Sequence, residues 1–168
     1  MNELDDIPAI LDDMAEQLAV RVRKMSDNPP AMVGIHTGGV WIAEQLHRRL
    51  KLADPLGSLD ISFYRDDFTR IGMNPVVQPS ALPFAIDNRH IILVDDVLHT
   101  GRTIRAALNE LFDYGRPASI LLAALIERGG RELPIEASVV GRKVSLQADE
   151  HIKLTGPSPL RLEIQQIT

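Results

Sequence analysis

Apolar and polar positions along this chain repeat with two periods, and each period predicts its own elements. Apolar residues recur at helical spacing over residues 7–22, with acidic residues between them, which predicts an amphipathic helix that ends at the Pro-rich breaker 26–30. The run Ala31–Ile35 predicts a short buried strand. After the His-Thr-Gly-Gly turn, apolar positions over residues 40–50 predict a second helix.

A second strand-turn-helix unit lies near the middle of the chain. Residues 91–94 are uniformly apolar, which is typical of a strand buried on both faces of a parallel sheet. Asp95 and Asp96 follow this strand, a loop covers residues 97–101, and helical spacing begins at Arg102. The sequence therefore brings two carboxylates and a helix N-terminus to one end of a buried strand.

The remaining pattern is mostly that of strands. Alternation over residues 59–64 and apolar character over 119–126 and 137–140 each predict a strand. The alternating stretch 160–167 predicts a last strand that closes the sheet at its edge. Residues 68–88 contain several Gly and Pro without clear periodicity, which predicts either a disordered insert or an active-site lid.

Composition narrows the class of protein. The chain has 168 residues, of which 45% are hydrophobic, enough for one domain with an ample core. It has no cysteine, no apolar run of membrane-spanning length and no signal-like N-terminus, so we expect a cytoplasmic protein without disulfides or thiolate metal sites. Its net charge of −5 excludes a general electrostatic attraction to nucleic acid.

The central unit carries the chemistry. A helix N-terminus offers unpaired N–H groups and the positive end of a dipole, which suit a phosphate, and Thr100, Gly101 and Thr103 lie there. Asp95 and Asp96 are placed to accept hydrogen bonds from the vicinal hydroxyls of a sugar. The combination indicates a ribose 5-phosphate, although an acidic pair at a strand end also occurs in α/β proteins without this function.

The motif VDDVLHTGRT in this unit resembles the 5-phosphoribosyl-1-diphosphate (PRPP) binding motif of type I phosphoribosyltransferases. Three further stretches, GIHTGGVWIAEQL (34–46), LDISFYRDD (59–67) and GRPASILLAALIERGGRELPIEASVVGR (115–142), are similar to the PyrR family. These are pyrimidine-operon attenuation regulators with uracil phosphoribosyltransferase activity. The resemblance implies a single α/β domain over residues 1–168, with a central, mainly parallel sheet flanked by helices, a flexible lid at 68–88 and a small hood at 127–168.

The resemblance also assigns residues. It implies catalytic roles for Asp95, Asp96 and Arg65, and a Mg²⁺ ion that binds with PRPP near the two aspartates without direct ligation by the protein. PRPP would be bound by Asp95, Asp96, Val97, Leu98, His99, Thr100, Gly101, Arg102 and Thr103. The diphosphate would be bound by Thr37, Gly38, Gly39 and Arg65, and the base by Glu127, Arg128, Gly129, Gly130 and Arg131. Two positions depart from the family's common pattern: Gly38 stands where an Arg is usual, and Gly130 stands where a His is common.

Two functions stay open at this point. One is transfer of the phosphoribosyl group of PRPP to uracil, which gives UMP, combined with regulation of pyrimidine genes. The alternative is a catalytically weak or silent regulator that senses UMP or UTP and binds pyr messenger RNA, as a homo-oligomer. Its candidate RNA-binding residues are Arg21, Arg23, Lys24, Arg142 and Lys143, although solvated surface charges are the better explanation of any single one of them. The acidic stretch 146–151 disfavours RNA binding, and the ERGGRELP segment disfavours a purine transferase.

Overall fold

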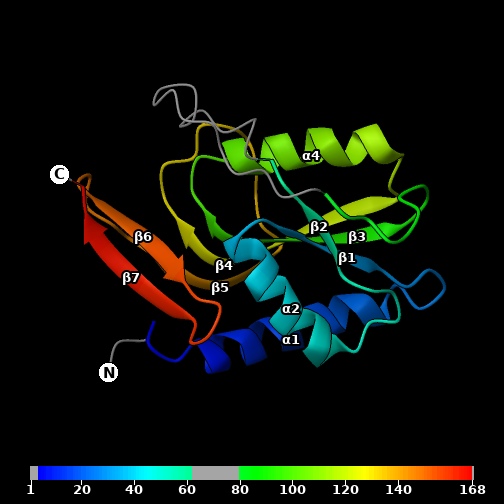
Figure 1. Cartoon of the computed structure of the whole chain (residues 1–168), viewed down its shortest axis with the longest axis horizontal. Coiled ribbons are helices and arrows are strands. Elements are labelled where there is room, and N and C mark those ends of the chain that lie inside the picture. Colours follow the sequence, from blue (N-terminus) through cyan, green and yellow to red (C-terminus); the bar gives the residue numbers. More distant parts are fainter. Residues whose placement is uncertain (1–3, 62–79, 168) are drawn as a thin grey trace.

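The computed structural model describes residues 4–61 and 80–167 as three layers (Figure 1). Two helices lie below a central sheet and one lies above it, while a separate two-stranded sheet lies beside the carboxyl ends of the central strands. The helices are α1 (Ile7–Arg23), α2 (Gly38–Leu50) and α4 (Arg102–Tyr114). The strands are β1 (Ala31–Ile35), β2 (Gly57–Leu59), β3 (His90–Leu98), β4 (Ser119–Arg128), β5 (Val139–Val144), β6 (Glu150–Thr155) and β7 (Arg161–Gln166).

The central sheet has five strands in the order β2-β1-β3-β4-β5, and every pairing in it is parallel. In its middle, Leu93 of β3 pairs with Val33 of β1 on one side and with Leu122 of β4 on the other. A strand that is covered on both faces must be apolar throughout, which explains the continuous hydrophobic runs in the sequence. The predicted α/β fold with a mainly parallel sheet is confirmed.

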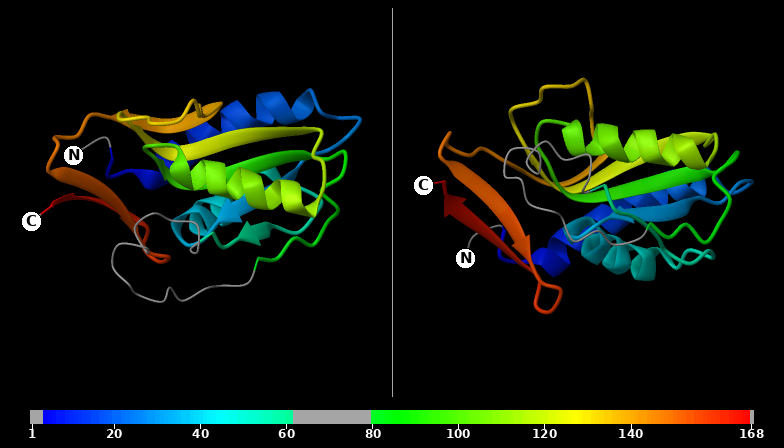
Figure 2. Two further views of the ribbon diagram at one scale, coloured as in Figure 1. Left: turned by 90° about the horizontal axis from the view of Figure 1, so that it is seen from above. Right: turned by 45° about the horizontal axis from the view of Figure 1, so that its top comes forward.

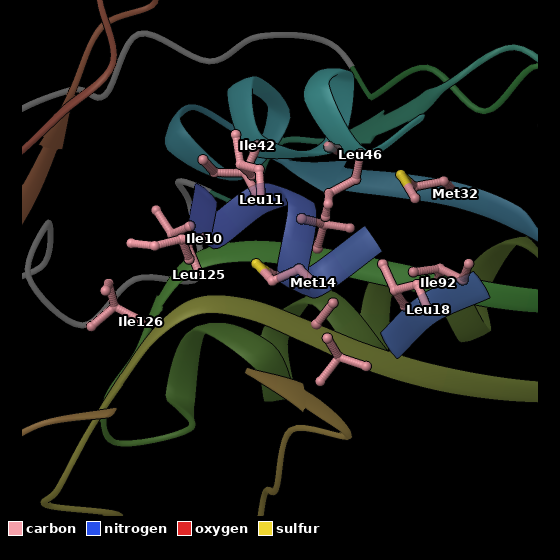
Figure 3. Close-up of a cluster of buried hydrophobic side chains, with 14 of the residues drawn as sticks. Ile10, Leu11, Met14, Leu18, Met32, Ile42, Leu46, Ile92, Leu125 and Ile126 are labelled. Atoms are coloured by element: carbon pink, nitrogen blue, oxygen red, sulfur yellow. The ribbon is translucent and has the colours of Figure 1, made fainter. Parts of the chain in front are cut away.

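The lower face of the sheet is covered by α1 and α2. Helix α2 packs on β1 and β3, while α1 packs on β4 and β5 and against α2. Figure 3 shows the resulting cluster, in which the apolar stripe of α1 meets side chains from both α2 and the strands. The labelled members are Ile10, Leu11, Met14, Leu18, Met32, Ile42, Leu46, Ile92, Leu125 and Ile126. The apolar residues of α1 therefore lie on one face of the helix, which packs against α2 and the sheet.

The upper face of the sheet is covered by α4 together with part of the predicted lid. Ile104, Ala107 and Leu111 of α4 are buried in a second cluster with residues of β1, β3 and β4. Residues 68–79 of the predicted lid lie outside the described residues. Residues 80–88 pack on the protein: Ala81 exchanges backbone hydrogen bonds with Ser58 at 2.8 and 2.9 Å, and Ile86 is buried.

The last strand does not lie where the sequence pattern predicted. Residues 160–167 were expected to close the central sheet, but β7 pairs with β6, antiparallel, in a sheet of its own (Figures 1 and 2). Alternation with period two predicts that a segment is a strand, but it does not select the partner. The partner, β6, begins within the acidic stretch 146–151 and was not predicted.

Several boundaries also differ from the prediction. Strand β3 continues through Asp95 and Asp96 to Leu98, so the two carboxylates lie on the strand itself. Leu59 is the last residue of β2 and not the first of a strand, and residues 62–64 lie outside the described part of the chain. None of the helices in the described segments is long and apolar enough to cross a membrane.

Candidate active site

The site lies where the order of the strands reverses. From β1 the chain proceeds through α2 to β2 on one side, whereas β3 lies beside β1 on the other side. Helix α2 follows β1 on the lower face, and α4 follows β3 on the upper face (Figures 1 and 2). The loops after β1 and β3 therefore diverge at the carboxyl ends of the strands, where open parallel sheets generally form the crevice in which they bind ligands.

The β1–α2 loop, a name used here for residues 36–39 and so including the first two residues of α2, is packed directly against the end of β3. The N–H of His36 donates a hydrogen bond to the carbonyl of Leu59, at 2.9 Å, and the His36–Thr37 peptide is cis. Gly39 is buried, and a Cβ added to it would lie 2.7 Å from the carbonyl oxygen of Val94. The loop and the two aspartates of β3 are thus adjacent, although they are far apart in sequence.

Asp95 and Asp96 differ in exposure. Asp95 is 3% exposed, and its Oδ1 accepts the N–H of Asp96 at 2.9 Å. Asp96 is half-buried, and its Oδ1 accepts the N–H of Val97 at 2.8 Å. Both carboxylates are therefore oriented by the backbone of their own strand. Oriented acceptors at a strand end suit the recognition of hydroxyl groups.

Gly38 makes the space that the Asp96 carboxylate occupies. A Cβ added to Gly38 would lie 2.2 Å from Asp96 Oδ2 and 2.8 Å from Asp96 Cγ, well inside any permitted contact. A side chain at position 38 therefore requires Asp96 to move. In the family an Arg is usual at this position. In this chain the position is Gly38, and the Asp96 carboxylate lies where the side chain would begin.

The β3–α4 loop (residues 99–101) directs the N-terminus of α4 toward the same crevice. Gly101 has φ of +94°, a conformation that glycine adopts without strain, and it is the N-cap of α4. The N–H of Arg102 donates to Thr100 Oγ1 at 3.2 Å. By helix geometry the next N–H groups, those of Thr103 and Ile104, have no partner within α4, so they are available to an anion.

The turn after β4, named here the hood turn (residues 127–135), is held against the β3–α4 loop. The N–H groups of Glu132 and Leu133 donate to the Thr100 carbonyl at 2.9 and 3.2 Å. Arg131 adds to this contact: its Nη1 donates to the carbonyl of His99 and its Nε donates to the carbonyl of Ile135 at 2.8 Å. The loop and the hood turn therefore form one hydrogen-bonded unit.

Several charged side chains of the hood turn are engaged in ion pairs, within the turn and with α4 and β5. Arg131 Nη2 pairs with Glu127 Oε1 at 2.9 Å, and Lys143 lies 3.6 Å from Glu127 Oε2. Arg102 pairs with Glu132 at 3.2 Å. Since these side chains are engaged, the exposed backbone of Gly129 and Gly130 is the part of the turn most open to a ligand.

His99 stands at the junction of the loop and the hood turn. A Cβ added to Gly130, whose φ is +103°, would lie 2.9 Å from His99 Nε2, so the ring lies against this glycine. Burial, followed by the positive charge of Arg128, lowers the pKa of His99 from its ordinary value of 6.5; Arg131 acts in the same direction and Glu132 opposes it. The imidazole is consequently neutral at pH 7.

The structure brings most of the predicted residues together. Those on residues 37–39, 95–103 and 127–131 lie around the same crevice, whereas Arg65 lies outside the described residues. The candidate RNA-binding residues lie along α1 and β5, and of these Lys143 contacts the hood turn. Arg21 donates to the carbonyl of Ser138 at 3.2 Å, Arg142 pairs with Asp13 at 3.0 Å, and Lys143 pairs with Glu127.

Two contacts near the site were not predicted. Arg128 donates to the carbonyl of Glu150 at 3.3 Å and so connects the end of β4 to β6. Trp41, in the first turn of α2, lies against Gly156 of the β6–β7 turn, where an added Cβ would be 3.2 Å from the ring. A lone Trp two residues after a Gly-Gly pair is the sequence signal that could have suggested such a contact.

A separate groove is apolar and lies elsewhere. It has a volume of about 450 Å³ between α4 and residues 134–138, and it extends to Pro117 and Ser119 near the amino end of β4. It contains neither of the two aspartates nor the β1–α2 loop. The polar chemistry therefore belongs to the crevice and not to this groove.

Known proteins with a similar sequence or fold agree with this geometry. Residues 1–156 match the family described as the phosphoribosyl transferase domain. The bifunctional protein PyrR of Nitrosococcus oceani is 62% identical over 164 residues, which cover 96% of this chain and 93% of that protein. The bifunctional protein PyrR of Pseudomonas aeruginosa is 58% identical over 154 residues, 92% of this chain and 91% of that protein. The hypoxanthine phosphoribosyltransferase of Trypanosoma cruzi has the same fold, with a TM-score of 0.66 at 20% identity over 86% of this chain and 80% of that chain.

Proposed function

This chain belongs to the phosphoribosyl transferase family and within it to the PyrR proteins, and we propose that it transfers the phosphoribosyl group of PRPP to uracil, forming UMP and diphosphate. The observation that carries the proposal is the convergence of three features on one crevice. They are the β1–α2 loop, the aspartates of β3 and the N-terminus of α4. Each of them suits a different part of PRPP.

The ribose 5-phosphate half of PRPP fits the β3–α4 side of the crevice. Asp95 and Asp96 accept hydrogen bonds from the ribose hydroxyls, because their carboxylates are oriented by backbone N–H groups. The 5-phosphate binds at the α4 N-terminus, where the N–H groups and the helix dipole favour an anion. Residues 97–103 form this part of the site.

The diphosphate half fits the β1–α2 side. Thr37, Gly38 and Gly39 lie at the N-terminus of α2, a second helix start that faces the same crevice. Arg65 is proposed to supply the positive charge there. With Gly38 in place of an Arg, the diphosphate is held by backbone N–H groups and the helix dipole more than by cationic side chains.

The reaction needs positioning and charge stabilisation more than a nucleophilic side chain. A uracil ring nitrogen attacks C1 of the ribose while the bond from C1 to diphosphate breaks. Holding the two substrates in line supplies much of the rate enhancement, and N–H groups aimed at the departing diphosphate stabilise its developing charge. The backbone of the hood turn at Gly129 and Gly130 is proposed to contact the base.

The residues of the crevice also fit Mg²⁺. Asp95 and Asp96 offer the hard oxygen donors that Mg²⁺ prefers, and the residues described include no cluster of three or more possible ligands that could hold a metal by itself. This donor set matches an ion held mainly by substrate oxygens, near the two aspartates. When bound, the ion would neutralise part of the diphosphate charge.

Regulation of pyrimidine genes is the second part of the proposal, and it rests on membership of the PyrR family. UMP and UTP would occupy the same crevice as effectors. Arg21, Arg142 and Lys143 contact protein groups, so among these candidates an RNA surface would rely most on Arg23 and Lys24, together with further copies of the chain. We propose a homo-oligomer, dimer or higher, for this reason.

The transferase is tested by formation of labelled UMP from labelled uracil and PRPP with Mg²⁺, in the wild type and in Asp96→Asn. The amide keeps the size of the side chain but removes the charge that accepts the ribose hydroxyls. We expect the variant to lose at least about 100-fold in kcat/KM, with unchanged thermal stability. Equal turnover by both proteins would contradict the assignment of Asp96, and no turnover by the wild type would contradict the transferase itself.

A further inference from the structure

His99 has a position that the ribose and phosphate contacts do not explain. It lies between Asp96, assigned to the ribose hydroxyls, and Thr100, at the start of the phosphate site. Its side chain is exposed and turns toward the hood turn, with Nε2 2.9 Å from the place that a Cβ of residue 130 would take. Gly130 therefore leaves room for the ring of His99.

The backbone around His99 is held in place. Arg131 Nη1 donates to the His99 carbonyl, and the next carbonyl, that of Thr100, accepts two N–H groups of the hood turn at 2.9 and 3.2 Å. The ring thus belongs to the unit formed by the loop and the hood turn. The imidazole makes no hydrogen bond to another residue that the structure describes, so its nitrogens are available to a ligand.

The charges that face His99 keep its ring neutral. Partial burial of the ring disfavours the imidazolium most strongly, Arg128 at the end of β4 and Arg131 in the hood turn act in the same direction, and Glu132 in the hood turn opposes them. The pKa of His99 is lowered as a result. A neutral imidazole has one nitrogen that can accept a proton at pH 7.

The proposed transfer creates a need for such a group. The uracil nitrogen that attacks C1 carries a hydrogen, and this proton must leave as the new bond forms. Asp95 and Asp96 are oriented for the sugar, and the hood turn offers glycine backbone to the base. His99 is a described residue that contacts the hood turn, the proposed base site, and its neutral side chain can take up a proton.

We propose that His99 contacts the nucleobase and accepts its proton, an inference that rests on the transferase function proposed above. The nitrogen of uracil forms the bond to C1 of the ribose, and the bond from C1 to diphosphate breaks. The proton on that nitrogen passes to the free ring nitrogen of His99, which becomes an imidazolium and returns the proton to solvent after the products leave. Atoms and charge balance without a further reactant.

The test compares His99→Gln and His99→Ala with His90→Gln. His90 is the first residue of β3, the strand that ends just before His99, and its ring contacts Ser119. His99→Gln keeps a polar side chain but cannot be protonated, and we expect it to lose at least about 100-fold in kcat. In the wild type kcat should fall as the pH drops through the lowered pKa of His99. This acidic limb should persist in His90→Gln and vanish in His99→Gln.

A binding measurement tests the contact without any turnover. Calorimetry with UMP and with ribose 5-phosphate compares ligands that differ by the base. We expect His99→Ala to weaken UMP about tenfold and leave ribose 5-phosphate unchanged, since the lost contact is to the base. Equal weakening of both ligands, or none, would overturn the contact, as would an unchanged pH profile for the proton transfer. Absence of wild-type turnover with a normal UMP difference would count against the transferase and the proton transfer, but would support the contact.

Discussion

The substitution Gly38→Ala is the sharpest test of how the two loops of the crevice depend on each other. The added methyl group would lie 2.2 Å from Asp96 Oδ2, so the Asp96 side chain must rotate away. Rotation breaks the hydrogen bond from the Val97 N–H to Asp96 Oδ1, at 2.8 Å. Losing a hydrogen bond to a charged group costs about 1.5–3 kcal/mol.

If that cost falls on the conformation that binds PRPP, kcat/KM for PRPP drops about 10- to 100-fold, because each 1.4 kcal/mol is roughly a factor of ten. The free energy of unfolding should change less than kcat/KM. Gly38 is the first residue of α2, and alanine favours a helix over glycine by about 0.5–1 kcal/mol. This gain offsets only part of the lost hydrogen bond, so we expect a slightly lower melting temperature together with a weaker enzyme.

Steady-state kinetics with varied PRPP, beside thermal melting, would measure both quantities. Glu44→Ala, on the exposed side of the same helix, is the matched control and should change neither. A cycle with Asp96→Ala isolates the contact: in that background Gly38→Ala should not weaken binding of ribose 5-phosphate further. Full activity of Gly38→Ala would refute the view that the position of Asp96 matters.

Three further predictions concern the surroundings of the site. Arg131→Lys keeps the charge but loses the fork that joins the carbonyls of His99 and Ile135 to Glu127; we expect a cost of about 2 kcal/mol, seen as a melting temperature about 4–8 °C lower. The pKa of His99 is lowered in the folded chain, so the unfolded chain binds this proton more readily. The free energy of unfolding should therefore fall as the pH drops below about 6.5. In thermal melts at each pH, His99→Gln should lose less stability than the wild type over that range. Trp41 is the single tryptophan and adjoins the β1–α2 loop, so diphosphate should change the intrinsic fluorescence, whereas an unchanged spectrum at saturation would contradict binding there.

The sequence was most informative where local pattern and local chemistry coincide. The apolar run before Asp95, the acidic pair and the helix from Arg102 were all readable, because a buried strand and an amphipathic helix have distinct periods. The parallel arrangement follows from continuous hydrophobic strands separated by helices. The family resemblance added the candidate roles of residues that no periodicity could assign.

Contacts between distant segments were not readable. Alternation identified β7 but not its pairing with β6, because strand partners are selected by the rest of the fold. The lost cation at Gly38 was evident from sequence, whereas the Asp96 carboxylate that fills its space was not. The bonds of the Arg131 guanidinium to backbone carbonyls and to Glu127 were not readable either.

The central claim is transfer of a phosphoribosyl group to uracil, and diphosphate release tests it most directly. Purified protein would be incubated with PRPP, Mg²⁺ and one nucleobase at a time: uracil, cytosine, hypoxanthine or guanine. We predict turnover with uracil and background release with the other bases. Release with a purine instead, or with none of the bases by a protein that is folded and binds UMP, would contradict the account.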